Sequence, residues 1–422
     1  MRSIRHVCLV MWLMLAAITA ATVARGQIPL PRDVGTTAEP RVHDGRERYL
    51  GVWGRDAWSE SRPAAVEVET DPGTGGLIVT NGFDRDHWRP FPAGFLRSAG
   101  RIENGELVTA LSPVVTGRYR LLPDGRLFAR LERRGTWHEV RYAIFERLPS
   151  EPQARAAALA DTEARPWRMV DIPMTDPDTG RSITLKATFY PPVVPGPVPL
   201  LLMNHGDVTP GVESLVQRHG ELARLFVSRG WAVLELMRRG AGGSGGTLLP
   251  EIRRDGPLTA EYGDRRMASD IADVDAALAT VRAWPQIDAH RILLGGQSRG
   301  GLIAIEYLAA RPESALGAIN FSGGAWSEAD ERTFLRGRYT RDRFARAGAV
   351  IRKPTLWLYG DNDRYYSAPF IQSWFDAYRA AGGDGTLRIV SGVPRNGHDL
   401  VFHPDFWEST MLDMITRIAD AK

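Results

Sequence analysis

Cysteine is almost absent from this chain, since its 422 residues contain only one, Cys8, within an apolar leader. If that leader is removed, disulfide bonds, catalytic thiolates and cysteine-based metal sites are all excluded. Lysine is nearly as scarce, with only Lys186, Lys353 and Lys422, so arginine supplies almost every positive charge.

The first 26 residues form a distinct segment. A basic start with Arg2 and Arg5 is followed by the apolar run VCLVMWLMLAAITAATVA and then by small residues. This order is typical of an export signal, and we expect cleavage after Gly26. An uncleaved membrane anchor is the alternative, because the run is just long enough to span a bilayer. The protein is therefore expected in the periplasm or outside the cell, with membrane contact only through this segment.

A surplus of charge of one sign is also lacking. The formal net charge is +3, but Arg2, Arg5 and Arg25 are the only charged residues of the leader, so the chain without it carries no net charge. No basic excess remains that would attract an acidic polymer. Nucleic-acid binding therefore has no support in the charge or in the motifs.

The length exceeds that of one ordinary hydrophobic core, so two domains are expected. Residues 46–148 contain short runs of β-forming residues separated by turn sequences such as DPGTGG, ENGE and LPDGR. This texture predicts a small antiparallel β domain, a sandwich or barrel of about seven or eight strands. An alanine-rich linker over 149–166 follows it.

Residues 167–422 alternate between strand and helix patterns. Continuous apolar runs such as VPLLLMN and RILLGG predict buried strands, and a helix near 264–284 carries one apolar stripe. Such alternation predicts a mostly parallel sheet with helices on both faces. No repeat of 20–50 residues is visible, so a solenoid is not expected.

The pattern Gly-x-Ser-x-Gly occurs twice, at Ser244 and at Ser298. Ser298 directly follows a buried strand and precedes a helix, the setting in which a nucleophilic serine is held on a sharp turn above a sheet. Gly296 and Gly300 fit this interpretation, because backbone passes close to such a turn. Ser244 lies between glycines, with Pro250 after it instead of a helix pattern, and is interpreted as a loop residue.

A serine needs a base to become a good nucleophile. In α/β-hydrolases the chain order is serine, acid, histidine. LYGDND offers Asp361 and Asp363 after a strand, and His398 lies in a later loop, with His403 five residues further on. We expect His398 to be the base, because its position fits this order and imidazole is a side chain suited to proton exchange near neutral pH.

These motifs together resemble a known family. The pieces NHGD, RRGAGGSGG, GGQSRGG, INFSGG, LYGDND and NGHDL follow one another from about residue 165 to 422. In this order they resemble α/β-hydrolases of the dienelactone hydrolase and prolyl oligopeptidase-like esterase group. The resemblance implies an α/β-hydrolase fold, here preceded by a small all-β domain, and a serine hydrolase without metal or cofactor.

The resemblance also assigns roles to individual residues. The acid of the triad is normally the third residue after the glycine, which is Asp363 and makes Asp361 a helper or turn residue. The oxyanion hole falls on the backbone N–H groups of Gly206 or Asp207 and of Arg299. Substrate contacts are expected at two further residues, Arg239 and Trp326. The alternatives are a loop-shaping role for Arg239 and its neighbour Arg238, and a core position for Trp326. His205 is interpreted as structural, because no second ligand at metal spacing accompanies it.

The expected activity is cleavage of a carboxylic ester, either a small molecule or one linked to a polymer. Dienelactone hydrolases proper use cysteine as nucleophile, and Ser298 at that position favours ester or amide cleavage instead. A serine peptidase of the prolyl oligopeptidase type is one alternative, although about 100 residues of β structure are too few for a propeller of that type. A catalytically inactive hydrolase fold that serves as a binding module is another.

Overall fold

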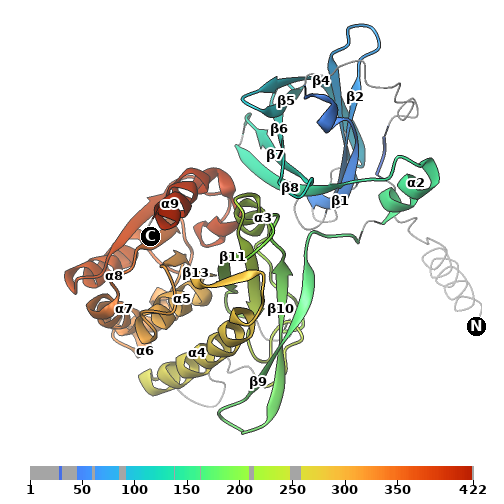
Figure 1. Cartoon of the computed structure of the whole chain (residues 1–422). Helices are drawn as coiled ribbons and strands as arrows, with labels where there is room; N and C mark the ends of the chain where they lie inside the picture. Colours follow the sequence, from blue (N-terminus) through green and yellow to red (C-terminus); the bar gives the residue numbers. More distant parts are fainter. Residues whose placement is uncertain are drawn as a thin grey trace, which may run out of the picture. The chain divides into compact units, whose positions relative to one another are not determined.

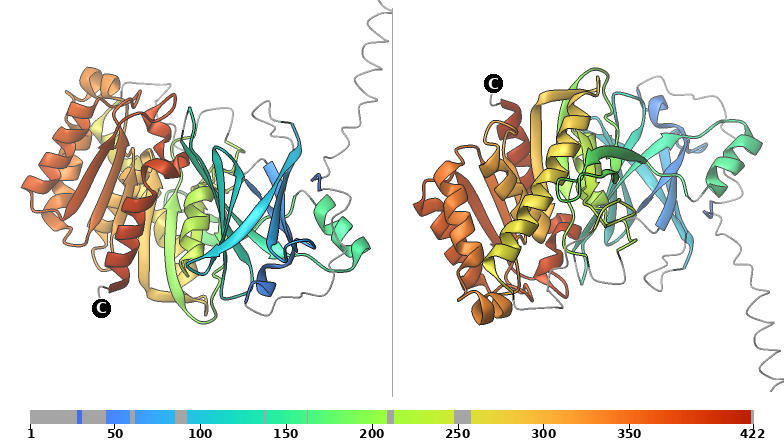
Figure 2. Two further views of the ribbon diagram at one scale, coloured as in Figure 1. Left: turned by 90° about the horizontal axis from the view of Figure 1, so that it is seen from above. Right: turned by 90° about the horizontal axis from the view of Figure 1, so that it is seen from below.

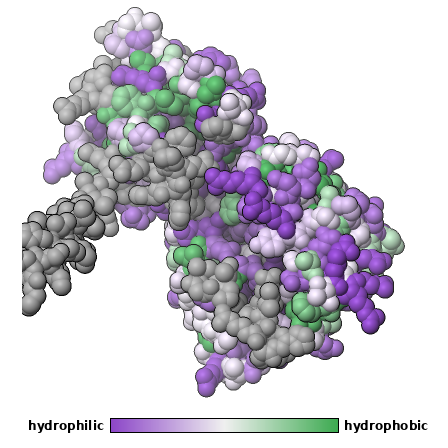
Figure 3. All heavy atoms as spheres, turned by 180° about the vertical axis from the view of Figure 1, so that it is seen from behind, coloured by the Kyte–Doolittle hydropathy of each residue, from purple (hydrophilic) through white to green (hydrophobic). Residues whose placement is uncertain are grey.

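The structure is a computed structural model (Figure 1), and it describes residues 28–30, 45–58, 62–84, 92–136, 138–161, 163–208, 213–247 and 258–420. The predicted leader over 1–26 lies outside the described residues. Within those ranges, no helix is both long and apolar enough to cross a membrane. Apart from the grey atoms, hydrophilic residues cover most of the face drawn in Figure 3, and apolar residues lie there in separate groups.

The chain forms two compact units. One comprises Met1–Pro113 with Phe145–Arg165, and the other comprises Val114–Ile144 with Pro166–Lys422. The segment expected to link two domains, 149–166, contains a short helix, α2 (Pro152–Ala160), with the Glu151 carboxylate at its N-terminus. The second unit thus contains part of the segment in which the β domain is predicted.

Eight antiparallel strands form a closed barrel in chain order, as expected for an all-β segment before the α/β part (Figure 1). Closure pairs β1 with β8 and leaves no free edge. The ENGE turn between β4 and β5 places Asn104 and Gly105 at positive φ, as a two-residue hairpin requires. The strands are β1 (Gly51–Trp58), β2 (Arg62–Thr70), β3 (Leu77–Phe83), β4 (Gly94–Glu103), β5 (Glu106–Ser112), β6 (Val115–Leu121), β7 (Leu127–Arg133) and β8 (Glu139–Arg147).

The α/β part is built on a second sheet, with strand order β16-β15-β14-β13-β11-β12-β10-β9. Neighbours among β11 to β16 run parallel, whereas β10 is antiparallel to both β9 and β12. The expected mostly parallel sheet is therefore present, with an antiparallel edge. Its strands are β9 (Arg168–Thr175), β10 (Ser182–Tyr190), β11 (Val198–Asn204), β12 (Ala232–Met237), β13 (Ile287–Gln297), β14 (Ala318–Phe321), β15 (Thr355–Gly360) and β16 (Gly385–Val390).

Helices cover both faces of this sheet (Figure 2). Side chains alternate between the faces of a strand, so Leu200 and Leu202 of β11 pack with α4, α5, α7 and α8, while Leu201 and Met203 pack with α3 and α9. Both faces are apolar, which explains the uninterrupted hydrophobic runs in the sequence. The helices of this unit are α3 (Gly220–Ser228), α4 (Ala260–Arg282), α5 (Arg299–Ala310), α6 (Glu328–Phe334), α7 (Tyr339–Val350), α8 (Ala368–Ala380) and α9 (Glu408–Asp420).

Candidate active site

The predicted site residues gather where the sheet order reverses. From β11 the chain continues to β12 on one side and later to β13 on the other, and both strands are parallel neighbours of β11. Loops at the carboxyl ends of such strands diverge and leave a crevice in which α/β proteins bind ligands. Asn204 at the end of β11 is in register with Gly296 of β13. The NHGD loop and Ser298 therefore leave the sheet side by side.

Ser298 occupies a sharp turn between β13 and α5. Its φ of 55° and ψ of −127° lie in a region that L residues rarely adopt. The Ser298 N–H donates to the carbonyl of Phe321 at the end of β14, at 2.8 Å, which fixes the turn. The serine is partly exposed although Gly296, Gln297, Arg299 and Gly300 around it are buried. Ser298 is thus the one residue of this turn that is not buried.

Two glycines permit this turn, as expected from the sequence. A Cβ at Gly296 would overlap the Gly300 carbonyl, and a Cβ at Gly300 would overlap the Asn204 carbonyl oxygen. In both cases the obstacle is backbone, which cannot rotate away as a side chain can. The close approach also brings the N-terminus of α5 against the end of β11.

His398 lies in the short 3₁₀ helix Gly397–Phe402 and is 7% exposed. Its N–H donates to the side-chain oxygen of Asn396, at 3.1 Å. The His398 Nδ1 is 2.9 Å from Oδ2 of Asp363. A carboxylate only accepts hydrogen bonds, so Nδ1 carries the proton and Nε2 is left as the basic atom.

Asp363, rather than Asp361, is the carboxylate that the structure brings to His398. The Asp363 side chain is 0% exposed, and its second oxygen accepts the N–H groups of Tyr365 and Tyr366 at 2.8 and 3.3 Å. Asp361, by contrast, is exposed at the end of β15. The Asp363 carboxylate is therefore held in place by three donors from two loops.

Contacts of Gln297 join the histidine loop to the serine turn. The Gln297 amide donates to the His398 carbonyl at 3.3 Å. On the other side, a Cβ built on Gly206 would lie 3.3 Å from Cβ of Ser298. The residues predicted as nucleophile, base, acid and oxyanion loop thus share one edge of the sheet.

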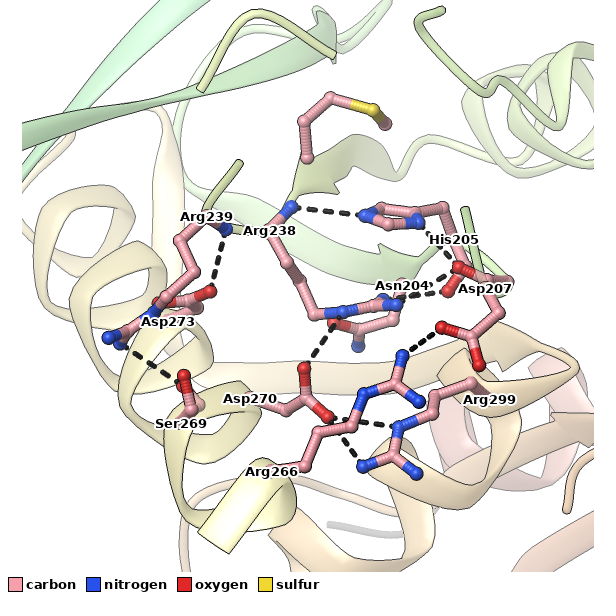
Figure 4. A network of polar contacts seen from close by, with 12 residues as sticks. Asn204, His205, Asp207, Arg238, Arg239, Arg266, Ser269, Asp270, Asp273 and Arg299 are labelled. Atoms are coloured by element: carbon pink, nitrogen blue, oxygen red, sulfur yellow. Dashed lines mark hydrogen bonds and ion pairs between the residues drawn. The ribbon is translucent and has the colours of Figure 1, made fainter. Parts of the chain in front are cut away.

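His205 is a buried part of the NHGD loop. Its Nε2 accepts the backbone N–H of Arg238 at 3.1 Å, and its Nδ1 lies 2.6 Å from the Gly206 carbonyl (Figure 4). Only a neutral ring protonated on Nδ1 can make both bonds. Burial and the charge of Arg238 lower the pKa of His205 well below its usual value, which keeps the ring neutral. Among the described residues, no group of three or more metal-binding side chains occurs.

The Asp207 carboxylate belongs to the NHGD loop, and arginine side chains compensate its negative charge. Burial raises its pKa, but the charges of Arg266 and Arg299 outweigh that effect, so the net shift is downward. Arg266 of α4 forms an ion pair with this carboxylate (Figure 4). An unpaired negative charge at this point would oppose an oxyanion.

The remaining predicted residues lie away from this edge or point elsewhere. Arg299 begins α5, where its N–H has no partner within the helix, and its side chain pairs with Asp270 at 3.0 Å. The Arg239 guanidinium is buried against Asp273 and Asp176 at 2.8 and 2.6 Å. The structure therefore does not bring Arg239 to Ser298.

Trp326 is completely buried in the core that α4 and α7 share. Its ring packs 4.7 Å from that of Tyr339, and a Cβ at Gly263 would overlap it. This placement is that of a core residue, so a substrate contact at Trp326 stays a prediction without support from its surroundings.

Two residues of the site, Gln297 and Asp270, were not given a role from the sequence, whereas Arg238 belongs to the RRGAGGSGG motif. Asp270 follows Arg266 by four residues on α4, and Asp273 follows three residues later, so the three share one helix face. That spacing of charges beside an apolar stripe was a usable signal for a buried ionic cluster. Gln297 carries no comparable signal for a contact with the histidine loop.

The second Gly-x-Ser-x-Gly serine, Ser244, has a different environment. Its hydroxyl donates to the Met237 carbonyl at 2.7 Å and accepts the Lys186 N–H at 2.8 Å. The first bond ties the loop after β12 to the end of that strand, and the second ties it to β10. This is a loop-fixing role.

No protein-family model and no curated protein sequence matches this chain. Solved structures do. An esterase from Pyrococcus furiosus is 17% identical, with a TM-score of 0.43, over 60% of this chain and 90% of its own. An esterase from Butyrivibrio proteoclasticus, solved with ferulic acid, is 18% identical with a TM-score of 0.43 over 60% of this chain and 100% of its own.

A dienelactone hydrolase-like promiscuous phosphotriesterase from metagenomic libraries is 17% identical, with a TM-score of 0.43, over 60% of this chain and 98% of its own. At such identities the likeness concerns the fold and carries nothing about substrates. The solved structures named here are two esterases and a dienelactone hydrolase-like phosphotriesterase.

Proposed function

We propose that this protein is a serine hydrolase of the α/β-hydrolase fold that cleaves carboxylic esters. The observation that carries the proposal is the strained turn of Ser298, set at the sheet edge that also holds a histidine hydrogen bonded to a buried carboxylate. Backbone strain of this kind is kept where it serves a reaction. The triad is Ser298, His398 and Asp363.

In the first half of the reaction, Ser298 Oγ attacks the ester carbonyl carbon while His398 Nε2 takes the hydroxyl proton. The carbonyl oxygen becomes negative and accepts hydrogen bonds from the N–H groups of Gly206 or Asp207 and of Arg299. The intermediate then collapses, the ester C–O bond breaks, and His398 returns the proton to the departing alkoxide. Asp363 stabilises the imidazolium that exists between these two transfers.

In the second half, water replaces the alcohol. His398 takes a proton from the water, the hydroxide adds to the acyl carbon, and the bond to Ser298 Oγ breaks as the proton is passed to that oxygen. A carboxylic acid leaves and the serine is restored. No step needs a group other than those of the chain and water.

The proposal includes export. The leader over 1–26 and its cleavage after Gly26 place the mature enzyme in the periplasm or outside the cell. The absence of cysteine from the chain after residue 26 suits such a compartment, because no thiol is open to oxidation there. Protein sequencing of the mature N-terminus after expression in a bacterial host tests this part directly.

The experiment that tests the activity compares Ser298→Ala with the intact protein on p-nitrophenyl acetate. We expect kcat/KM to fall at least about a thousandfold, because no nucleophile remains. His398→Ala should lose activity to a similar extent, since residues of a triad act together. A fluorophosphonate probe should label the intact protein and not Ser298→Ala.

Ser244→Ala is the matched control, because it removes the serine of the other Gly-x-Ser-x-Gly motif. Its activity should stay within a few-fold of the intact protein, and circular dichroism should show all variants folded. Activity or labelling retained by a folded Ser298→Ala contradicts the proposal. Turnover of aminoacyl amides in preference to esters would instead assign the same site to a peptidase.

A further inference from the structure

Arg238 is 1% exposed and follows β12, where its side chain reaches back to the NHGD loop. Its two terminal nitrogens donate to the carbonyls of His205 and Gly206, at 2.7 and 3.0 Å (Figure 4). A planar guanidinium that binds two successive carbonyls fixes the orientation of both peptides more tightly than a single donor could.

The orientation of these peptides decides where their N–H groups point. The bonds are trans, so the N–H of each peptide unit points opposite to its carbonyl. Because the carbonyls of His205 and Gly206 face Arg238, the N–H groups of Gly206 and Asp207 face away from it. These are the N–H groups proposed for one half of the oxyanion hole. The positive charge behind the carbonyls also polarises both amides and strengthens them as donors.

The other half of the oxyanion hole is tied to the same arginine through Asp270 of α4. Asp270 Oδ1 lies 3.2 Å from Nε of Arg238, and Asp270 Oδ2 accepts from Nε and a terminal nitrogen of Arg299, at 3.1 and 3.0 Å. Arg299 supplies the second proposed N–H donor from its backbone. One buried carboxylate therefore connects the arginine that orients one donor to the residue that carries the other (Figure 4).

We propose that Arg238 and Asp270 are positioning residues that hold the two halves of the oxyanion hole at a fixed separation. The inference rests on the proposed serine hydrolase activity and deepens it, since neither residue touches the substrate. The stabilisation of a developing oxyanion depends on donors that are already in place when charge forms. Arg238 keeps the N–H groups of Gly206 and Asp207 in place through buried hydrogen bonds to the carbonyls of the same peptides, and Asp270 holds the side chain of Arg299.

The test uses the full mature chain with Arg238→Gln and Asp270→Asn. Each change removes one arm of the connection and keeps a similar volume. We expect kcat on p-nitrophenyl acetate to fall about tenfold to a hundredfold with KM nearly unchanged, because misplaced donors weaken only the transition state. The affinity for a trifluoromethyl ketone, which forms a tetrahedral adduct with an oxyanion, should fall in parallel with kcat/KM.

Rates are expressed per active site, counted by complete titration with a fluorophosphonate, so that misfolded protein does not enter the result. Arg343→Gln is the matched control. Its guanidinium is also buried and paired with carboxylates, Glu306 at 2.8 Å and Asp264, but it has no contact with the NHGD loop. It should lower stability and leave kcat per active site unchanged. The double variant of Arg238 and Asp270 should lose no more than the more damaging single change.

If Arg238→Gln does not fold, Arg238→Lys and Asp270→Asn decide the matter. Lysine keeps the charge but cannot bind both carbonyls as a fork, so an intermediate kcat is expected. The inference is overturned if the Arg238 and Asp270 variants match Arg343→Gln in kcat per active site and in ketone affinity. That result would leave the proposed serine hydrolase activity standing. An intact protein that neither labels with fluorophosphonate nor hydrolyses esters would overturn the proposed function, and the inference with it.

Discussion

At the scale of single residues, the candidate site depends on side chains that already have their hydrogen-bond partners within the protein. The Asp363 carboxylate is 0% exposed and accepts bonds from His398, Tyr365 and Tyr366. Such a carboxylate is fixed before a substrate arrives, so it can hold the imidazole in one tautomer throughout the reaction. Asp361, two residues earlier, is exposed to water and lacks this setting.

This difference predicts the effect of two matched changes in one loop. Asp363→Asn should lower kcat by about a thousandfold or more, because an amide that donates toward Nδ1 favours the wrong tautomer of His398. Asp361→Asn should change kcat by no more than a few-fold. Steady-state kinetics on a p-nitrophenyl ester, with circular dichroism as the check on folding, measures both. The opposite ranking would assign the acid role to Asp361.

At the scale of elements, α6 and α7 are joined by a buried carboxyl group without a cation. Glu331 of α6 is 0% exposed and accepts bonds from the N–H and the hydroxyl of Thr340, near the start of α7. Burial raises its pKa to about 7, a larger effect than the hydrogen bonds that lower it. The folded protein therefore favours the protonated form of this group.

The raised pKa predicts a pH-dependent stability. The contribution of Glu331 is fully present below the ordinary glutamate pKa of 4.5 and is lost as pH rises through about 7. Glu331→Gln mimics the protonated group, so it should be more stable than the intact protein at pH 8 and similar at pH 5. The expected gain at pH 8 is on the order of 3 kcal/mol.

Urea unfolding of both proteins at pH 5 and pH 8 measures this difference, with Glu328→Gln as the control. Glu328 lies one turn earlier on the same helix and pairs with Arg332, which, with the Ser367 N–H, holds its pKa below the ordinary value despite partial burial. That change should not raise stability at pH 8. A Glu331→Gln variant that gains nothing between pH 5 and pH 8 would show that the carboxyl is ionised when folded.

Element boundaries also show what local patterns miss. The sequence pattern predicts a helix at about 212–229, but α3 begins at Gly220. Before it, the Gln217 side chain donates to the Asp207 carbonyl at 3.3 Å and the Glu235 carboxylate accepts the His219 N–H. The pattern at the C-terminal end predicts a helix from about 403, but the last helix begins at Glu408, after a short 3₁₀ turn that starts at Pro404. In both places a contact distant in sequence, or a proline, overrides helix propensity.

At the scale of the whole molecule, Val114–Ile144 belongs to the same compact unit as the α/β sheet. Phe128 and Tyr142 lie in one apolar cluster with residues of α3 and α9. Arg130 forms a forked ion pair with Glu408, at 2.9 and 2.7 Å, and the Tyr142 N–H donates to the carboxylate of Glu221 at 2.7 Å. The α/β unit is therefore incomplete without these residues.

This predicts the behaviour of a truncated protein. A chain that starts at residue 149, the expected beginning of the linker, should give less soluble protein and a lower Tm than the chain that starts at residue 27. The reason is the apolar surface of α3 and α9 that the missing residues cover. Soluble yield and differential scanning calorimetry measure it, and an equally stable fragment would contradict the unit boundary at Val114.

Much of the fold and of the site follows from local pattern. The apolar stripe of the helix expected near 264–284 is buried in α4 at Met267, Val274, Leu278 and Val281, and the turn sequences around 46–148 fall between strands. Ser298 could be chosen over Ser244 because strand, turn and helix are adjacent in sequence. Arrangements of this kind depend on backbone preferences within a few residues, and these can be read from one chain.

The sequence by itself determined the alternation of elements, the serine turn with its glycines, and the chain order of the residues proposed as nucleophile, acid and base. Only the tertiary structure decided that Asp363 is hydrogen bonded to His398 and that the β strands close as a barrel. It also decided that Arg238 donates to carbonyls of the NHGD loop whereas Arg239 pairs with Asp273. The physical reason is the same in each case. The partner that packing brings to a side chain or to an edge strand lies far away along the chain, and no local pattern specifies it.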